Sequence, residues 1–133
     1  MKALVFSLVA SCVSMTPAFS QSNDCDTVEK CQKVLEKSAQ SSLAHYRLGE
    51  ILFGSESYLS AGNEFRAALT GDLDPKWTEV WSHIALGKIF DIRNQRDRAV
   101  NEYRLAQLTK DNTRGARDQA AKYMESPFQR PSK

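Results

Sequence analysis

The sequence predicts an all-α protein, a short α-solenoid of about six helices made of a half-repeat, two full repeats and a C-terminal capping helix. Apolar residues recur at three- and four-residue spacing, which is typical of helices with one buried face. One residue pattern also occurs twice along the 133 residues. Hydrophobic residues make up 41% and charged residues 26%, as in an average soluble globular domain. We expect a signal peptide (1–20), one helical domain (21–126) and a C-terminal tail (127–133).

The first twenty residues are predicted to be a signal peptide. A lysine in second position precedes the apolar stretch Ala3–Met15, and small residues at Ala18 and Ser20 suit cleavage before Gln21. The stretch is shorter than the ~20 residues that a membrane-spanning helix needs. We therefore expect a periplasmic or secreted protein with no integral membrane span. In an alternative interpretation, the four residues ending at Cys12 form a lipobox and Cys12 anchors a lipoprotein to the membrane.

Cleavage would leave two cysteines, Cys25 and Cys31. In an oxidising compartment these two can pair. Within one regular helix they would lie ~9 Å apart along the axis, beyond the ~7 Å between α-carbons that a disulfide tolerates. A disulfide therefore requires Cys25 to precede the helix and fold back on its first turn. The alternative is a buried Cys31 and a free thiol at Cys25.

Two segments of the chain, 45–53 and 83–91, match each other. Each begins with a histidine, followed three residues later by a Leu-Gly pair that ends in Gly49 in the first segment and Gly87 in the second. Each glycine is followed at the same offsets by an alanine, an aromatic residue and a second alanine: Ala61, Phe65 and Ala68, then Ala99, Tyr103 and Ala106. Glycine inside a helix costs about 1 kcal/mol relative to alanine. We therefore expect another helix backbone to pass close to each glycine, with the alanines on the approaching surface.

Helical patterns flank the two copies. Residues 26–39 carry an apolar face and show, upstream of the first copy, the spacing of its alanine-aromatic-alanine pattern. At the other end, Asn112 or Thr113 is expected to cap a last helix that runs to about Glu125. Pro127 then ends it, because the residue before a proline disfavours the helical conformation. The basic tail beyond is predicted to be a solvated chain end.

These patterns resemble the tetratricopeptide repeat, a helix–turn–helix unit of about 34 residues with conserved Leu-Gly, alanine and aromatic positions. Leu48-Gly49 and Leu86-Gly87 match the Leu-Gly pair, and the resemblance covers residues 26–125. The interval between the two pairs is longer than one repeat of the family. It implies an insertion of about four residues between Gly71 and Thr78.

The chain carries little that indicates catalysis, so we expect no enzyme, no cofactor and no metal. His45 and His83 occupy equivalent repeat positions, which favours a packing role, and a metal-binding histidine pair is the alternative. The acidic residues between Gly71 and Glu79 lack the remaining ligands of a calcium loop. We expect a solvated loop between the repeats there.

The resemblance implies a function. In the repeat family, the first helices of successive repeats line a concave face that binds peptides or partner helices. The corresponding outward residues here are Tyr46, Glu50, Phe53, Trp81, Ile84, Lys88 and Asp91. We therefore expect a non-catalytic protein–protein interaction module, an adaptor or assembly factor of the cell envelope with a protein or peptide partner. Self-association into a structural homo-oligomer is the alternative. The net charge of +2 is too small to indicate a nucleic-acid partner.

Overall fold

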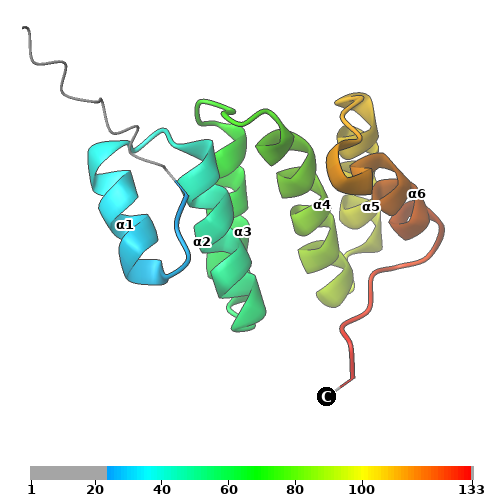
Figure 1. Ribbon diagram of the computed structural model, residues 1–133. Coiled ribbons are helices and arrows are strands. Elements are labelled where there is room, and N and C mark those ends of the chain that lie inside the picture. The colour runs from blue at the N-terminus through cyan, green and yellow to red at the C-terminus, as the bar shows by residue number, and fades with distance from the viewer. Residues whose placement is uncertain (1–23, 133) are drawn as a thin grey trace, which may run out of the picture.

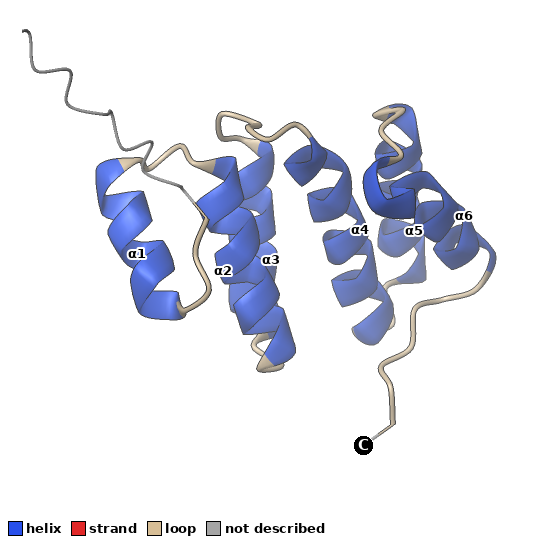
Figure 2. Cartoon of the chain, viewed as in Figure 1, coloured by secondary structure: helices blue, strands red, loops and turns tan. Residues whose placement is uncertain are grey.

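A computed structural model describes residues 24–132, and the regular secondary structure of this part of the chain is entirely helical (Figures 1 and 2). The predicted fold class, a short all-α solenoid, is confirmed. The predicted signal peptide and Cys12 lie outside the described residues. The helices are α1 (Val28–Lys37), α2 (Ser42–Gly54), α3 (Tyr58–Leu69), α4 (Trp77–Ile92), α5 (Arg96–Leu108), the 3₁₀ turn η1 (Thr113–Gly115) and α6 (Ala116–Glu125).

The helices pack mainly against their neighbours in sequence. The most extensive contacts join α2 with α3 and α4 with α5, so the chain forms two successive helical hairpins. Helix α1 packs on α2, α3 packs on α4, and α6 packs on α5 at the other end, as Figure 1 shows. Packing of each repeat mainly against its neighbours in sequence is typical of a solenoid.

The two hairpins repeat the same local contacts. Each turn between paired helices has one residue with positive φ, Glu56 (63°) in the first hairpin and Asn94 (57°) in the second. The histidines are also equivalent. His45 Nδ1 lies 2.7 Å from the Glu64 carboxylate, and His83 Nδ1 lies 2.8 Å from that of Glu102. Each histidine therefore links the first helix of its hairpin to the second.

Each helical glycine of the Leu-Gly pairs lies against an aromatic ring. A Cβ atom on Gly49 would lie 2.7 Å from Phe65 Cε1, and one on Gly87 would lie 2.7 Å from Tyr103 Cδ1. Both rings are buried. The expected close approach is therefore present, but the approaching group is a ring from the next helix. The backbone and alanines that the sequence predicted are not the nearest atoms to either glycine.

A disulfide and an N-cap side chain stabilise the start of α1. Cys25 precedes α1 and is bonded to Cys31 in its first turn, with the Cα atoms 5.1 Å apart. The Thr27 hydroxyl accepts a hydrogen bond from the Lys30 amide at 3.2 Å, as an N-cap side chain does. Cys31, Ala44 and other buried residues form a small core between α1 and α2.

The last helix begins later than predicted. Arg114 (φ 56°) has a non-helical backbone and Gly115 (φ 73°) is left-handed, so α6 starts at Ala116. Asn112 still serves this helix start, because its side-chain oxygen accepts a hydrogen bond from the Arg117 amide at 2.9 Å. The predicted end at Glu125 is correct.

The insertion between the repeats folds back on the start of α2. The Asp72 carboxylate accepts a hydrogen bond from the Ser42 amide at 3.0 Å, and the Ser42 hydroxyl accepts one from the Leu73 amide at 2.8 Å. The Asp72 amide in turn donates to the Gln40 carbonyl at 2.8 Å. The loop expected to be solvated is therefore joined by hydrogen bonds to the first repeat.

Candidate partner-binding groove

The first helices of the two hairpins, α2 and α4, border a groove of about 230 Å³. We call it the α2–α4 groove. Six of the seven residues predicted for the concave face line it, and the structure adds three more. Its lining residues are Tyr46, Glu50, Phe53, Gly54, Phe65, Trp81, Ile84, Ala85 and Lys88.

Helical spacing explains why these residues meet. Tyr46, Glu50 and Phe53 are four and three residues apart on α2, so their side chains follow one stripe of the helix. Trp81 and Lys88 are seven residues apart, two turns along α4. Because α2 and α4 each contribute one stripe, the two stripes form opposite walls of the groove.

Two predicted outward residues form the floor instead. Tyr46 is 5% exposed and Ile84 is fully buried. The Tyr46 ring packs against Phe65 and Trp77, with centroids 5.7 and 5.2 Å apart, and its hydroxyl donates to Glu50 at 2.9 Å. Burial, together with the neighbouring Glu50 carboxylate, raises the pKa of Tyr46 well above its usual value. The prediction that Tyr46 and Ile84 point outward was therefore wrong, and both belong to the core.

Asp91 was also predicted to face a partner, and this was wrong. Its side chain is completely buried and is not among the residues that line the groove. The carboxylate accepts hydrogen bonds from Arg96 at 3.0 Å, from the Tyr103 hydroxyl at 2.8 Å and from the Phe128 amide at 2.8 Å. Burial, followed by the hydrogen bond to Asp91, raises the pKa of Tyr103. Asp91 therefore joins α4, α5 and the C-terminal segment.

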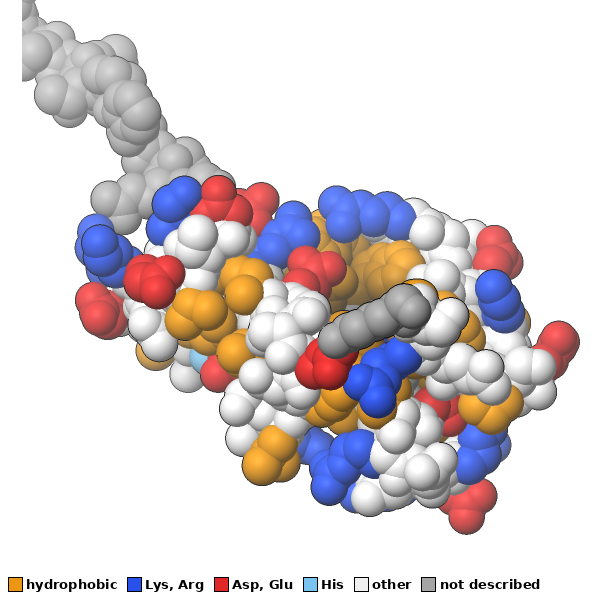
Figure 3. Space-filling model, turned by 90° about the horizontal axis from the view of Figure 1, so that it is seen from below, with side chains coloured by type: hydrophobic (Ala, Val, Ile, Leu, Met, Phe, Trp, Pro, Cys, Tyr) orange, Lys and Arg blue, Asp and Glu red, His pale blue; other side chains and the backbone are white. Residues whose placement is uncertain are grey.

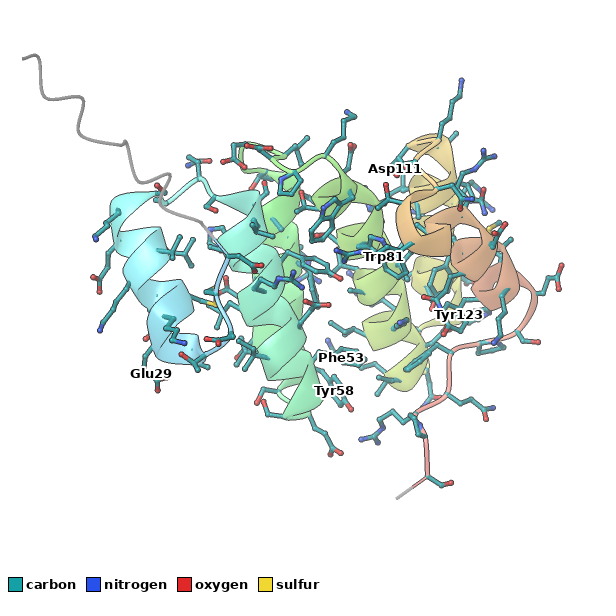
Figure 4. The ribbon with its side chains drawn as sticks, viewed as in Figure 1. Glu29, Phe53, Tyr58, Trp81, Asp111 and Tyr123 are labelled. Carbon is teal, nitrogen blue, oxygen red and sulfur yellow. A yellow bond between two sulfur atoms is a disulfide. The ribbon has the colours of Figure 1, made fainter. Side chains whose placement is uncertain are left out.

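The walls carry the accessible side chains. Phe53 and Trp81 are half-buried, and the Trp81 indole N–H donates to the Thr113 carbonyl at 3.1 Å, which fixes the orientation of the ring. Figure 4 shows Trp81 higher on α4 and Phe53 at the lower end of α2, so the two aromatic side chains occupy different levels. The walls therefore offer two separate aromatic contact points.

Two charges of opposite sign lie between these aromatic residues. The Glu50 carboxylate accepts hydrogen bonds from Tyr46 and from Arg47, at 2.9 and 2.8 Å. Lys88 has no carboxylate within salt-bridge distance in the described part of the chain, and its Nζ lies over the rings of Tyr123 and Phe128 at 5.5 and 5.2 Å. Burial lowers the pKa of Lys88.

Trp77 is a neighbour of the groove that the sequence analysis missed. Its ring contacts Tyr46 and lies beneath two guanidinium groups, Arg114 at 4.6 Å and Arg47 at 5.7 Å. The repeat pattern gave no signal for it, because Trp77 is the first residue of α4 and follows the insertion. The upper end of the groove is therefore flanked by cations.

The C-terminal segment was predicted to be a solvated end, but it folds back on the helices. Phe128 packs against Tyr123 on α6 and Phe53 on α2, with centroids 5.4 and 6.3 Å apart. Arg130 reaches Glu56 at 3.3 Å and the Tyr58 hydroxyl at 3.2 Å. Seen from below, hydrophobic and basic side chains lie next to one another on this face of the molecule (Figure 3).

Residues 24–132 contain no cluster of three or more side chains suited to bind a metal. Over the same range, no helix is both long and apolar enough to cross a bilayer. No family model, curated protein or solved structure matches the chain.

Proposed function

We propose that this protein is a non-catalytic binding module whose α2–α4 groove holds a segment of a partner protein. The observation that carries the proposal is the groove itself. Two half-buried aromatic side chains, Phe53 and Trp81, stand on opposite walls above a floor formed by Tyr46 and Ile84. Aromatic side chains in partly enclosed positions dominate the binding energy of many protein interfaces.

The groove also supplies polar contacts that would set the register of a bound segment. Glu50 directly follows Gly49 and Lys88 directly follows Gly87, so they occupy the same position in successive repeats but carry opposite charges. Charges at the border of an interface contribute mainly to orientation and to association rate. An extended segment with an apolar side chain between a cation and an anion would match this arrangement.

The helical hairpins and the leader-like N-terminal residues bear on the repeat family and on the compartment of this activity. We infer that the hairpins are repeats of the tetratricopeptide type, from the Leu-Gly, alanine and aromatic positions named above. The leader-like first twenty residues support an activity in the periplasm or outside the cell. An adaptor or assembly factor of the cell envelope agrees with both features.

The test is affinity capture from an envelope extract with the wild-type protein, with Trp81→Ala and with a control. Truncating a hot-spot aromatic residue typically costs about 2 kcal/mol or more of binding free energy, which is roughly a 30-fold loss of affinity. The control is Leu59→Ala, because Leu59 is 69% exposed and does not line the groove. Equal capture by Trp81→Ala and the wild type would refute the proposal, provided that their circular dichroism spectra agree.

Self-association into a structural assembly is the second candidate. Leu59 on α3 and Leu108 on α5 are large apolar side chains that are 69% and 67% exposed. Both would be covered if second helices of neighbouring copies met. Light scattering over a range of concentrations separates the two candidates. A stable oligomer that Leu59→Ala and Leu108→Ala disrupt would favour the structural role.

A further inference from the structure

We propose that the C-terminal segment Pro127–Ser132 is a built-in occupant of one end of the α2–α4 groove. A partner displaces it with an extended segment that carries an aromatic side chain and, two residues later, a cation. This inference rests on the proposed function. It adds the chemistry of the partner and a way in which the binding site is kept closed.

The segment contacts the groove directly. Phe53 and Lys88 line the groove and also contact the Phe128 ring, at a centroid distance of 6.3 Å and an Nζ-to-centroid distance of 5.2 Å. We define the tail seat as the residues that the segment contacts. These are Phe53, Glu56, Tyr58, Lys88, Asp91 and Tyr123. Because Phe53 and Lys88 belong to both, the seat and the groove are one continuous surface.

The contacts of the segment are those of a bound peptide. One backbone amide, that of Phe128, donates to the buried Asp91 carboxylate at 2.8 Å. One aromatic side chain fills the space between Phe53 and Tyr123. One cation, Arg130, meets the Glu56 carboxylate at 3.3 Å and lies over the Tyr58 ring at 5.4 Å. Phe53 and Tyr58 lie side by side at the lower ends of α2 and α3 (Figure 4).

The spacing of these contacts defines the partner. Gln129 lies between Phe128 and Arg130 and is exposed. The tail seat therefore contacts an aromatic side chain and the cationic side chain two positions later. Pro127 and Pro131 flank this triplet. Proline restricts the residue before it to extended conformations. A partner segment of the same aromatic-x-cation pattern would make the same contacts.

The segment is held lightly enough to be displaced. Only Phe128 is half-buried, while the other residues of Pro127–Ser132 are exposed. A short tether nevertheless gives the segment an effective concentration in the millimolar range. If the free segment binds the seat with a dissociation constant near 100 μM, the tethered segment occupies about nine seats in ten, and a competitor loses about tenfold in apparent affinity.

The test measures binding of a labelled peptide with the sequence of residues 126–133, by fluorescence anisotropy. The receptors are the full-length wild type, the full-length double variant Phe128→Ala with Arg130→Ala, and the control Gln129→Ala. We expect the double variant to bind the peptide about tenfold more tightly than the wild type, and the control to match the wild type. A peptide with alanine in place of its phenylalanine and arginine should not bind.

Two results would overturn the inference. Either the double variant binds the peptide no better than the wild type does, or it fails to bind the peptide at all, which would make the segment a structural clasp only. If the double variant does not fold, Arg130→Glu replaces it. This single change at an exposed position opposes the Glu56 carboxylate, and it should still raise peptide affinity several-fold. No increase with folded Arg130→Glu would equally refute the inference.

Two further measurements separate this inference from self-association and from the proposed function. A wild-type dimer that Phe128→Ala dissociates would place the segment in the seat of a second copy, and would overturn occupancy within one chain. Trp81 lines the groove but lies outside the tail seat. If Trp81→Ala abolishes capture of envelope partners while the peptide does not bind, the proposed function stands and the further inference fails. If the peptide binds but Trp81→Ala captures partners as the wild type does, the proposed function fails.

Discussion

Replacing Gly87 with alanine should destabilise the protein, although alanine is the better helix former. The added Cβ atom would lie 2.7 Å from the Cδ1 atom of the Tyr103 ring, closer than carbon atoms pack. Tyr103 has no room to retreat, because it is fully buried and its hydroxyl is held by Asp91 at 2.8 Å. Overpacking of this kind costs about 1–3 kcal/mol, against a gain in helix propensity of about 1 kcal/mol.

We therefore expect Gly87→Ala to lower the free energy of unfolding by about 1 kcal/mol. Gly49→Ala should cost less, because the Phe65 ring that it meets has no hydrogen bond to fix its position. Gly54→Ala is the matched control, since a Cβ there meets nothing within 4 Å. It should be neutral or slightly stabilising. Urea and thermal unfolding of the three variants measure this order.

An equal or higher stability of Gly87→Ala would refute the reasoning, because it would show that the Tyr103 ring is free to move. The more severe Gly87→Leu should cost at least as much as Gly87→Ala. If both Gly87 variants were as stable as Gly54→Ala, the assignment of α4 and α5 as a closely packed hairpin would itself be wrong.

Three further perturbations test other parts of the structure. Asp91→Ala should cost about 3 kcal/mol or more in unfolding experiments, since it removes the acceptor of three donors from a buried site, whereas Asp91→Asn should cost less. Lys88→Met should stabilise the protein at neutral pH, because the lowered pKa of Lys88 shows that folding disfavours its charged form. This gain in unfolding free energy should shrink as the pH rises through the lowered pKa of Lys88 toward 10.5. Urea titrations of the wild type and the variant at several pH values measure it, and a gain that does not change with pH would contradict the prediction. Reducing the Cys25–Cys31 disulfide should lower stability by about 2 kcal/mol, from the short loop that it closes, and an unchanged midpoint in dithiothreitol would contradict that.

The repeat pattern predicted most of the fold. Helical spacing and the matched segments around Gly49 and Gly87 were enough to predict two hairpins with flanking helices, because core positions recur with the period of the structure. Distance required Cys25 to precede the helix if the two cysteines pair, and the structure has both the bond and this order. The start of α6 did not, because the left-handed backbone at Gly115 depends on a local turn that periodicity does not report.

The site was harder to predict because equivalent positions in a repeat are not equally exposed. Tyr46 and Ile84 each directly follow the histidine of their segment, and two large apolar side chains at one repeat position indicate a buried position rather than a binding surface. Phe53 and Asp91 are also equivalent, yet one lines the groove and the other is buried. The difference arises because Arg96, the Tyr103 hydroxyl and the Phe128 amide all donate to Asp91, whereas Phe53 packs against the Phe128 ring.

The same carboxylate connects the core to the end of the chain. Asp91 accepts from Tyr103, whose ring fixes the contact with Gly87, and from the Phe128 amide, which positions the segment at the groove. Arg96 extends the connection, because it donates to the Tyr123 carbonyl at 2.7 Å at the end of α6. Displacing the segment would therefore remove one of the donors that stabilise this buried charge. A partner that supplies its own backbone amide at this point would restore the lost hydrogen bond, whereas a small apolar molecule in the groove would not. The arrangement thus favours an extended peptide as the ligand.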